Sequence, residues 1–198
     1  NFSFTIDKKL KFDDLKLETN IDLDQLTFTQ KSLNFEPFLL NTNEEIKLEK
    51  HKIKINYNKD QLTIDGWGSI FLTDNIEQLS YSIIKDRNQL LFDAELSIKN
   101  NPLIIKFLDY EKKKGVNSII SINGDLKKNG SIKFKSISLE ETKNKILINN
   151  LELSPTLKIK NLVSASVDYK NNKDIVNKLN IKRNGSNFIL EGDSFNAE

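Results

Sequence analysis

The residues able to do chemistry are few in this chain of 198 residues. It contains no Cys and a single His, His51. Zero cysteines exclude disulfide frameworks, thiolate zinc sites, iron–sulfur clusters and a Cys nucleophile. One histidine excludes a His-rich metal site but leaves Ser–Lys and carboxylate mechanisms open. Any catalysis would therefore have to use hydroxyl, amine or carboxylate groups.

Two motifs combine such groups. Gly192-Asp193-Ser194 resembles the opening of the GDS-type esterase motif, but that family places it near the N-terminus, before a helix. Asp22 and Asp24 lie two apart, and Asp13-Asp14 lies at an expected bend; paired carboxylates do acid–base work or bind Ca²⁺. The further oxygen ligands and the glycine of an EF-hand loop are absent. We interpret the first motif as a strand-ending turn and the aspartates as the wet face of a strand.

Three other features each fit two interpretations. Lys112-Lys113-Lys114 would either contact acidic lipid headgroups or form a solvated helix end. Asn129-Gly130-Ser131 and Asn184-Gly185-Ser186 match the N-glycosylation pattern, but both also fit hairpin turns. Trp67, the only Trp, lies between two glycines and is either a ligand contact or a core residue.

Composition narrows the function further. The 30 Lys and Arg nearly cancel the 28 Asp and Glu, leaving a net charge of +2, which is not the charge of a nucleic-acid-binding protein. No apolar stretch is long enough for a membrane-spanning helix, and no signal peptide is recognisable. We expect one domain, residues 1–198, cut from a longer protein that carries any anchor or export signal elsewhere.

The hydrophobic pattern has a period of two residues. The clearest example is the segment 90–98, in which one face carries only apolar side chains: Leu90, Phe92, Ala94, Leu96 and Ile98. Asp93, Glu95 and Ser97 fall on the other face. This alternation predicts a half-buried strand with one wet face.

A second pattern shifts the apolar positions by one residue partway along a strand. It occurs in segments 10–17, 132–139 and 146–153, and more loosely in 62–71 and 157–162. A β-bulge would return the apolar side chains to one face and bend the strand. We expect bulges or bends at Asp13-Asp14, Lys135-Ser136 and Asn149-Asn150, and hence a curved sheet.

The remaining segments predict an antiparallel meander. Strands are expected at 2–7, 19–28, 45–57, 78–85, 118–123, 164–169, 176–182 and 187–192. Turns are expected at 58–60, 86–88, 123–125, 128–130, 171–172 and 184–185. Residues 102–113 are the exception, because Asn101 and Pro102 suit a helix start and the apolar spacing is helical. We predict one short helix there, packed on the sheet.

A long antiparallel sheet with one apolar face must cover that face. Long bent strands fit a curled groove better than a sandwich or a membrane barrel, and a groove leaves apolar surface for a long apolar guest such as acyl chains. Trp67 and the five apolar residues of segment 90–98 are the predicted lipid contacts.

The end of the chain carries a resemblance to a known family. Residues 190–197, Leu-Glu-Gly-Asp-Ser-Phe-Asn-Ala, look like the "G-x-S-F-D-A" end-of-repeat phrase of AsmA-like proteins of the YhdP/TamB type, with Asn196 in place of Asp. The strand, Asn-Gly turn, strand sequence of 181–190 fits the same style. The resemblance implies an inner-membrane anchor outside this segment, a curled periplasmic β-sheet, and conduction of phospholipids toward the outer membrane of Gram-negative bacteria.

The sequence therefore predicts a non-enzymatic, lipid-conducting β-groove segment without cofactors, metal or nucleic-acid partners. Its partners would be phospholipid acyl chains and, through the missing anchor, the inner membrane. The alternative is a structural or adhesive β-sandwich or β-solenoid without lipid. A third option is an esterase that uses Ser194.

Overall fold

The computed structural model describes residues 1–6, 8, 12–29, 39, 43 and 45–195. Most of them form strands, which occur in this order: β1 (Phe2–Ile6), β2 (Phe12–Thr29), β3 (Glu45–Asn58), β4 (Gln61–Phe71), β5 (Ile76–Lys85), β6 (Gln89–Ile98), β7 (Leu103–Ile105), β8 (Tyr110–Lys112), β9 (Ser118–Lys127), β10 (Ile132–Glu140), β11 (Lys145–Leu153), β12 (Ile159–Asn161), β13 (Ser164–Lys170), β14 (Val176–Asn184) and β15 (Asn187–Ser194). A 3-10 turn, η1 (Lys106–Leu108), separates β7 from β8.

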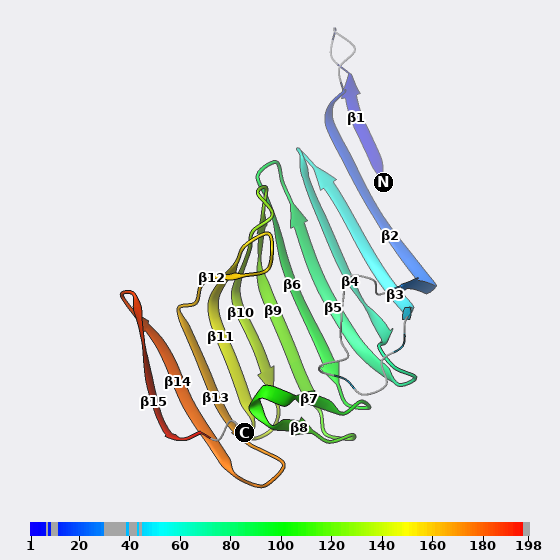
Figure 1. Cartoon of the computed structure of the whole chain (residues 1–198). Helices are drawn as coiled ribbons and strands as arrows, with labels where there is room; N and C mark the ends of the chain where they lie inside the picture. Colours follow the sequence, from blue (N-terminus) through cyan, green and yellow to red (C-terminus); the bar gives the residue numbers. More distant parts are fainter. Residues whose placement is uncertain (7, 9–11, 30–38, 40–42, 44, 196–198) are drawn as a thin grey trace.

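The strands form one long, open, antiparallel sheet. Its order follows the chain from β1 to β6 and then from β9 through β10, β11, β13 and β14 to β15, while short β12 pairs with β11 (Figure 1). Hairpin β7–β8 forms a separate two-stranded sheet. The sheet does not close into a barrel, so β1 and β15 are its two edges. The predicted antiparallel, bulged and curved sheet is confirmed.

Two of the predicted bulges, at Lys135-Ser136 and Asn149-Asn150, occur where the apolar pattern shifts by one residue. The register of β9 and β10 slips between Phe134 and Ser136, which leaves Lys135 as the extra residue. Lys135 faces Asn150, which has a left-handed backbone with a φ of 51°. The two extra residues therefore sit side by side, and β10 and β11 bend together without losing register. The register of β1 and β2 also slips in the segment that contains Asp13-Asp14.

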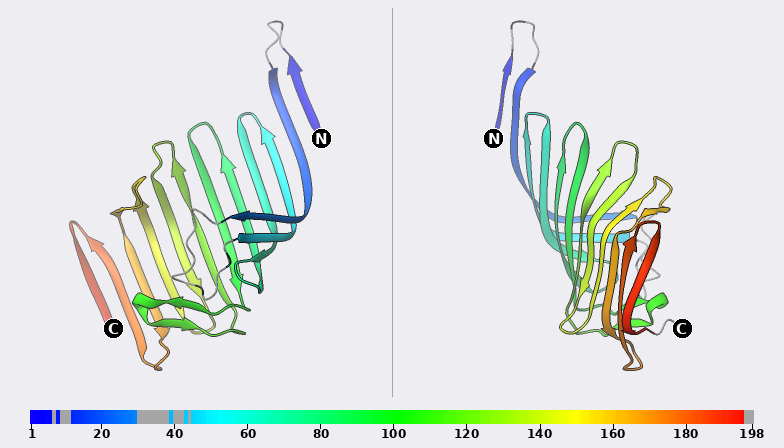
Figure 2. Two further views of the ribbon diagram at one scale, coloured as in Figure 1. Left: turned by 45° about the vertical axis from the view of Figure 1, so that its right-hand side comes forward. Right: turned by 90° about the vertical axis from the view of Figure 1, so that its left-hand side faces the viewer.

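Another bend was missed, and one predicted shift is absent. Leu23 pairs with His51 and Gln25 with Glu49, so Asp24 faces Lys50, whose φ is 50°. Below this bulge β2 and β3 turn sharply toward the side on which β7–β8 lies (Figure 2). The shift expected in 62–71 does not occur, because β4 pairs with β5 in continuous register.

The predicted helix over 102–113 is wrong. Asp109, with a φ of 47°, ends η1 after three residues and reverses the chain, so Leu103–Ile105 pair with Tyr110–Lys112. Short apolar runs fit a buried strand and a buried helix equally well by period, and here pairing and burial on the sheet decide between them.

The turn predicted at 123–125 is also wrong, because these residues lie inside β9. A Cβ on Gly124 would come 2.3 Å from the Lys133 carbonyl oxygen, beside the Lys135 bulge. The glycine therefore marks a close backbone approach and not a turn. At 58–60 the turn is as predicted: Lys59 and Asp60 have φ of 48° and 67°, as a tight hairpin requires.

Candidate functional site: an open apolar face

One face of the large sheet, here called the apolar face, carries the predicted lipid contacts of β6. Ala94 lies between Tyr81 of β5 and Ile122 of β9, and this row of paired residues continues to both sides. The Ala94 row crosses the sheet from β2 to β15 through Ile21, Ile53, Gly66, Tyr81, Ala94, Ile122, Ile137, Ile148, Ala165, Ile181 and Leu190. At a spacing of ~4.8 Å per strand this apolar row is roughly 50 Å long.

Parallel rows lie above and below it. The Phe92 row contains Thr19, Ile55, Ile64, Ile83, Phe92, Gly124, Phe134 and Leu151. The Leu90 row contains Leu17, Tyr57, Leu62, Lys85, Leu90, Leu126, Ile132 and Leu153. On the other side, the Leu96 row contains His51, Gly68, Leu79, Leu96, Ile120, Leu139, Ile146, Val167 and Leu179.

Burial divides these rows. The buried apolar side chains gather at and below the Leu96 row, where Ile98, Leu139 and Ile146 pack with Leu103 and Tyr110 of β7–β8. None of the fully buried hydrophobic residues belongs to the Ala94, Phe92 or Leu90 rows, whose larger side chains are half-buried or exposed. Leu190 is 62% exposed and Ile21 40%. We call these three rows the open rows, because no described element covers them.

Hairpin β7–β8 covers the other end of the apolar face. The rings of Tyr110 and Tyr169 meet edge to face with centroids 5.4 Å apart. The Tyr169 hydroxyl donates a hydrogen bond to the Leu108 carbonyl oxygen. Asn171 Nδ2 donates to Asp109 at 3.0 Å. These contacts join the hairpin to β13 and the turn after it, although β13 is far from the hairpin in sequence.

A buried carboxylate fixes the loop that leads into the hairpin. Glu77 is 2% exposed and accepts four hydrogen bonds, from the backbone N–H groups of Lys99, Asn100 and Asn101 at 2.7–2.8 Å and from Asn101 Nδ2 at 2.8 Å. Thr73 Oγ1 also donates to Asn101. A buried charge is tolerated where donors satisfy it, so this network holds the loop in one conformation.

Lys112 lies buried beside this network. Its ammonium donates to the Asn101 carbonyl oxygen at 2.6 Å, and its side chain is 1% exposed. Burial lowers the pKa of Lys112, and the carboxylates of Glu77 and Glu141 act in the opposite direction. The Lys112–Lys114 run is therefore neither a solvated helix end nor a uniform basic patch: its first member is structural, and only Lys113 and Lys114 are exposed.

Two glycines of β4 make room for rings on the apolar face. A Cβ on Gly66 would lie 2.3 Å from Tyr81 Cζ, and one on Gly68 would lie 2.5 Å from His51 Nδ1. His51 is 1% exposed, and burial lowers its pKa. The single histidine is thus a core residue.

Trp67 does not lie with the other predicted contacts. It pairs with Ser80 of β5, and Ser80 pairs with Glu95 of β6, which places Trp67 on the polar face. Its side chain is 51% exposed, so it is not a core residue either. The prediction assumed a parity shift in β4, whereas Gly66 and Gly68 occupy the apolar positions. The structure brings Leu90, Phe92, Ala94, Leu96 and Ile98 onto one face and leaves Trp67 apart. Of these five, Ile98 is 1% exposed and packs in the core with Leu103 and Tyr110, so it is not open to lipid.

The other motifs show no catalytic geometry. Ser194 donates to the Val176 carbonyl oxygen at 2.5 Å, and its strand β15 is far along the sheet order from His51 in β3. Asn129 Oδ1 accepts from both the backbone and the hydroxyl of Ser131, which is 1% exposed, as in a structural turn. Among the described residues, no group of His, Asp or Glu has the geometry of a metal site.

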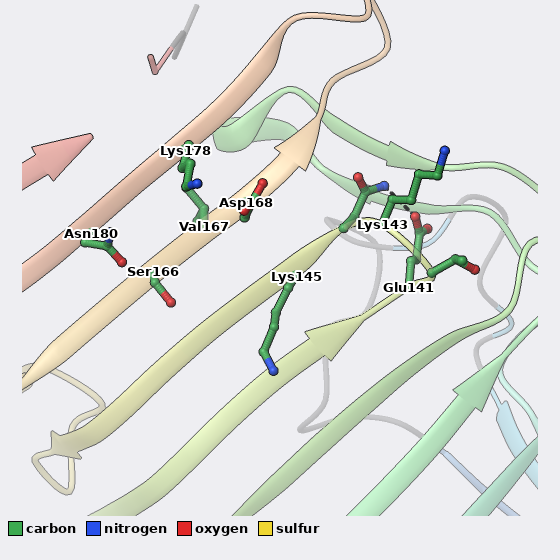
Figure 3. Close-up of a pocket in the computed structure, with 10 residues that line it drawn as sticks. Glu141, Lys143, Lys145, Ser166, Val167, Asp168, Lys178 and Asn180 are labelled. Atoms are coloured by element: carbon green, nitrogen blue, oxygen red, sulfur yellow. Dashed lines mark hydrogen bonds between the residues drawn. The ribbon is translucent and has the colours of Figure 1, made fainter. Parts of the chain in front are cut away.

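A hollow of about 390 Å³ lies at the end of β11, β13 and β14 (Figure 3). Its lining mixes charges of both signs: Glu141, Lys143, Lys145, Asp168 and Lys178. Lys145, Asp168 and Lys178 form a paired row on the polar face. The hollow has no buried nucleophile and lies on the side of the sheet away from the open rows.

The chain matches no protein-family model, no curated protein and no solved structure. The resemblance to AsmA-like proteins therefore remains a prediction. In the part of the chain that the structure describes, no helix has the length and apolar character needed to cross a membrane.

Proposed function

We propose that this chain is a non-enzymatic lipid-binding segment that holds acyl chains against the open rows. The observation that carries the proposal is an apolar surface that crosses the sheet from β2 to β15 without cover from the described residues. Continuous exposed apolar surface of this size usually marks a binding site.

The mechanism would be passive. Apolar side chains replace the bilayer around the acyl chains, while headgroups stay in water. Each buried CH₂ contributes ~0.8 kcal/mol, so two long chains supply ample retention energy. A row of similar Ile, Leu and Ala side chains has no single deep minimum, which favours sliding along the sheet. In an AsmA-like setting this segment would be part of a periplasmic path for phospholipids.

The test is phospholipid content. We expect mass spectrometry to find phospholipid bound to the purified protein, and Phe92→Asp to lower the amount severalfold. Phe92 lies in an open row and contacts Phe134, with ring centroids 5.7 Å apart. The matched control is Leu91→Asp, because Leu91 is the adjacent residue, is also half-buried and faces the polar side.

Circular dichroism and urea unfolding of both variants show whether the sheet is intact. Equal lipid loss in the two folded variants would contradict a role for the apolar face. Absence of phospholipid from the unmodified protein, even after incubation with vesicles, would reject the proposal and favour the structural alternative.

A further inference from the structure

Positive charge is concentrated where the strands end on one side of the sheet. This edge is formed by hairpin turns and is distinct from the edge strands β1 and β15. Alternate turns of a meander lie at the same edge, and five turns at this edge consist wholly of described residues: 58–60, 85–88, 127–131, 154–158 and 183–186 (Figure 1). They contain seven cationic side chains: Lys59, Lys85, Arg87, Lys127, Lys128, Lys158 and Arg183. They contain two acidic residues, Asp60 and Asp86. This basic edge thus carries +5, whereas the whole chain carries +2.

The two carboxylates of the basic edge already have partners. Asp60 forms an ion pair with Arg87. Asp86 accepts the backbone N–H groups of Asn88 and Gln89 at 2.7 and 2.9 Å. All five lysines of this edge are exposed, and none of them belongs to an ion pair in the described part of the chain. They are Lys59, Lys85, Lys127, Lys128 and Lys158. The two backbone hydrogen bonds lower the pKa of Asp86, and Lys128 helps to lower it through its charge. Like the other four lysines, however, Lys128 is exposed and forms no ion pair in this part of the chain, so an external anion can reach it.

The basic edge borders the open rows directly. Lys85 is itself a member of the Leu90 row and lies between Leu62 and Leu90 on the apolar face. A lysine in that position can lay its methylene chain on apolar surface and keep its ammonium in water. Lysines also occur at the opposite edge, but β7–β8 covers the apolar face there.

The open rows have a length that suits one acyl chain. From Leu90 to Leu96, whose row packs against the buried core, is six residues, or ~20 Å along the strand. One leaflet of a bilayer holds about 15 Å of hydrocarbon, half of the ~30 Å core. A chain that starts at the basic edge would therefore reach the covered end without exceeding it.

We infer that the ligand is an anionic, phosphate-bearing amphiphile with its headgroup at the basic edge and its acyl chains pointing toward hairpin β7–β8. The inference rests on the proposed function and adds the charge and orientation of the lipid. A phosphate at this edge would contact lysines from adjacent turns, such as Lys85 and Lys128, while neutral diacylglycerol would gain nothing from them.

The test measures which lipids the whole protein extracts. The protein is incubated with phosphatidylcholine vesicles that contain equal amounts of phosphatidic acid and diacylglycerol, re-isolated, and analysed by mass spectrometry. We expect enrichment of phosphatidic acid. The Lys85→Gln/Lys128→Gln variant should reduce that enrichment at least fivefold, since one lysine near an anionic lipid surface contributes a factor of about five. Its uptake of diacylglycerol should fall by a smaller factor than its uptake of phosphatidic acid, because the neutral lipid gains nothing from the two ammonium groups.

The control is Lys52→Gln/Lys178→Gln, which removes two exposed lysines from the polar face and should keep the enrichment. Lipid uptake without any preference for phosphatidic acid would overturn this inference and leave the proposed function standing. No uptake of any lipid would overturn both.

Two further experiments test whether other anions bind to the basic edge. Calorimetry with inorganic phosphate alone, or with a single-stranded oligonucleotide, should show no binding that depends on Lys85 and Lys128. Such binding to phosphate would mean a phosphate site unrelated to lipid, and binding to the oligonucleotide would mean a nucleic-acid surface. Either result would contradict the inference.

Discussion

Replacement of Glu77 by Gln should loosen the loop that leads into hairpin β7–β8. Glu77 Oε1 accepts three of the four hydrogen bonds, and Oε2 accepts the fourth, from the Lys99 N–H group at 2.8 Å. The glutamine side chain can place its carbonyl oxygen at the position of Oε1 and keep those three hydrogen bonds. Its amide NH₂ group then faces the Lys99 N–H group. That backbone donor loses its acceptor, and the negative charge near buried Lys112 disappears.

The expected loss of stability follows from these contacts. A buried donor without an acceptor costs about 1–3 kcal/mol, and hydrogen bonds to a charged acceptor are stronger than those to a neutral one. Glu77→Gln should therefore lower the free energy of unfolding by about 2–3 kcal/mol. Glu77→Ala leaves all four donors unpaired and should cost about 4 kcal/mol or more.

Urea unfolding followed by circular dichroism measures the global effect. Hydrogen exchange at the amides of Lys99, Asn100 and Asn101 measures the local one. The control is Glu95→Gln, because Glu95 is exposed on the polar face of β6. The reasoning is refuted if Glu77→Gln stays within about 0.5 kcal/mol of this control, the usual range of surface substitutions, and the three amides exchange at unchanged rates.

Two other predictions concern the rings beside the glycines of β4. Gly66→Ala should cost about 1–3 kcal/mol in urea unfolding, because its Cβ would meet the Tyr81 ring, and Tyr81→Leu should relieve much of that cost; strictly additive effects in the double variant would contradict this. His51 has a lowered pKa in the folded state, so below pH 6.5 the unfolded chain binds a proton that the folded chain does not. Stability should therefore fall as the pH drops from 7.5 to 5.5, and His51→Leu should flatten that slope; an unchanged slope would mean that other groups cause it.

Most of the sheet could be predicted from the sequence because period-two patterns and turn residues are local signals. The segment 90–98 is β6 in the expected alternation, and the parity shift at Lys135 marks a bulge. The shift from Leu23 to Leu26 in β2 carries the same signal for the bend at Asp24. That bend was missed only because residues 19–28 also fit one long strand.

The cover over the apolar face could not be predicted in this way. Residues 103–112 pair with themselves and pack on strands far along the chain, and Tyr169 meets Leu108 across 61 positions. The four donors of Glu77 come from a loop that has no pattern of its own. The sequence pattern placed Trp67 on the apolar face because a Trp contributes more to a hydrophobic pattern than two glycines do. In the structure the two glycines hold the apolar positions.

The division between core and candidate site depends on this cover and not on residue type. Phe92 and Leu96 lie on the same face of β6, two rows apart, yet Leu96 packs against the buried core and Phe92 lies in an open row. Leu96 is only half-buried, but an aspartate there would press a charge against the buried core, so Leu96→Asp should lower the free energy of unfolding more than Phe92→Asp does. Phe92→Asp should leave the sheet folded and reduce lipid content. If both variants unfold equally in urea, the open rows are ordinary core and the acyl-chain proposal loses its physical basis.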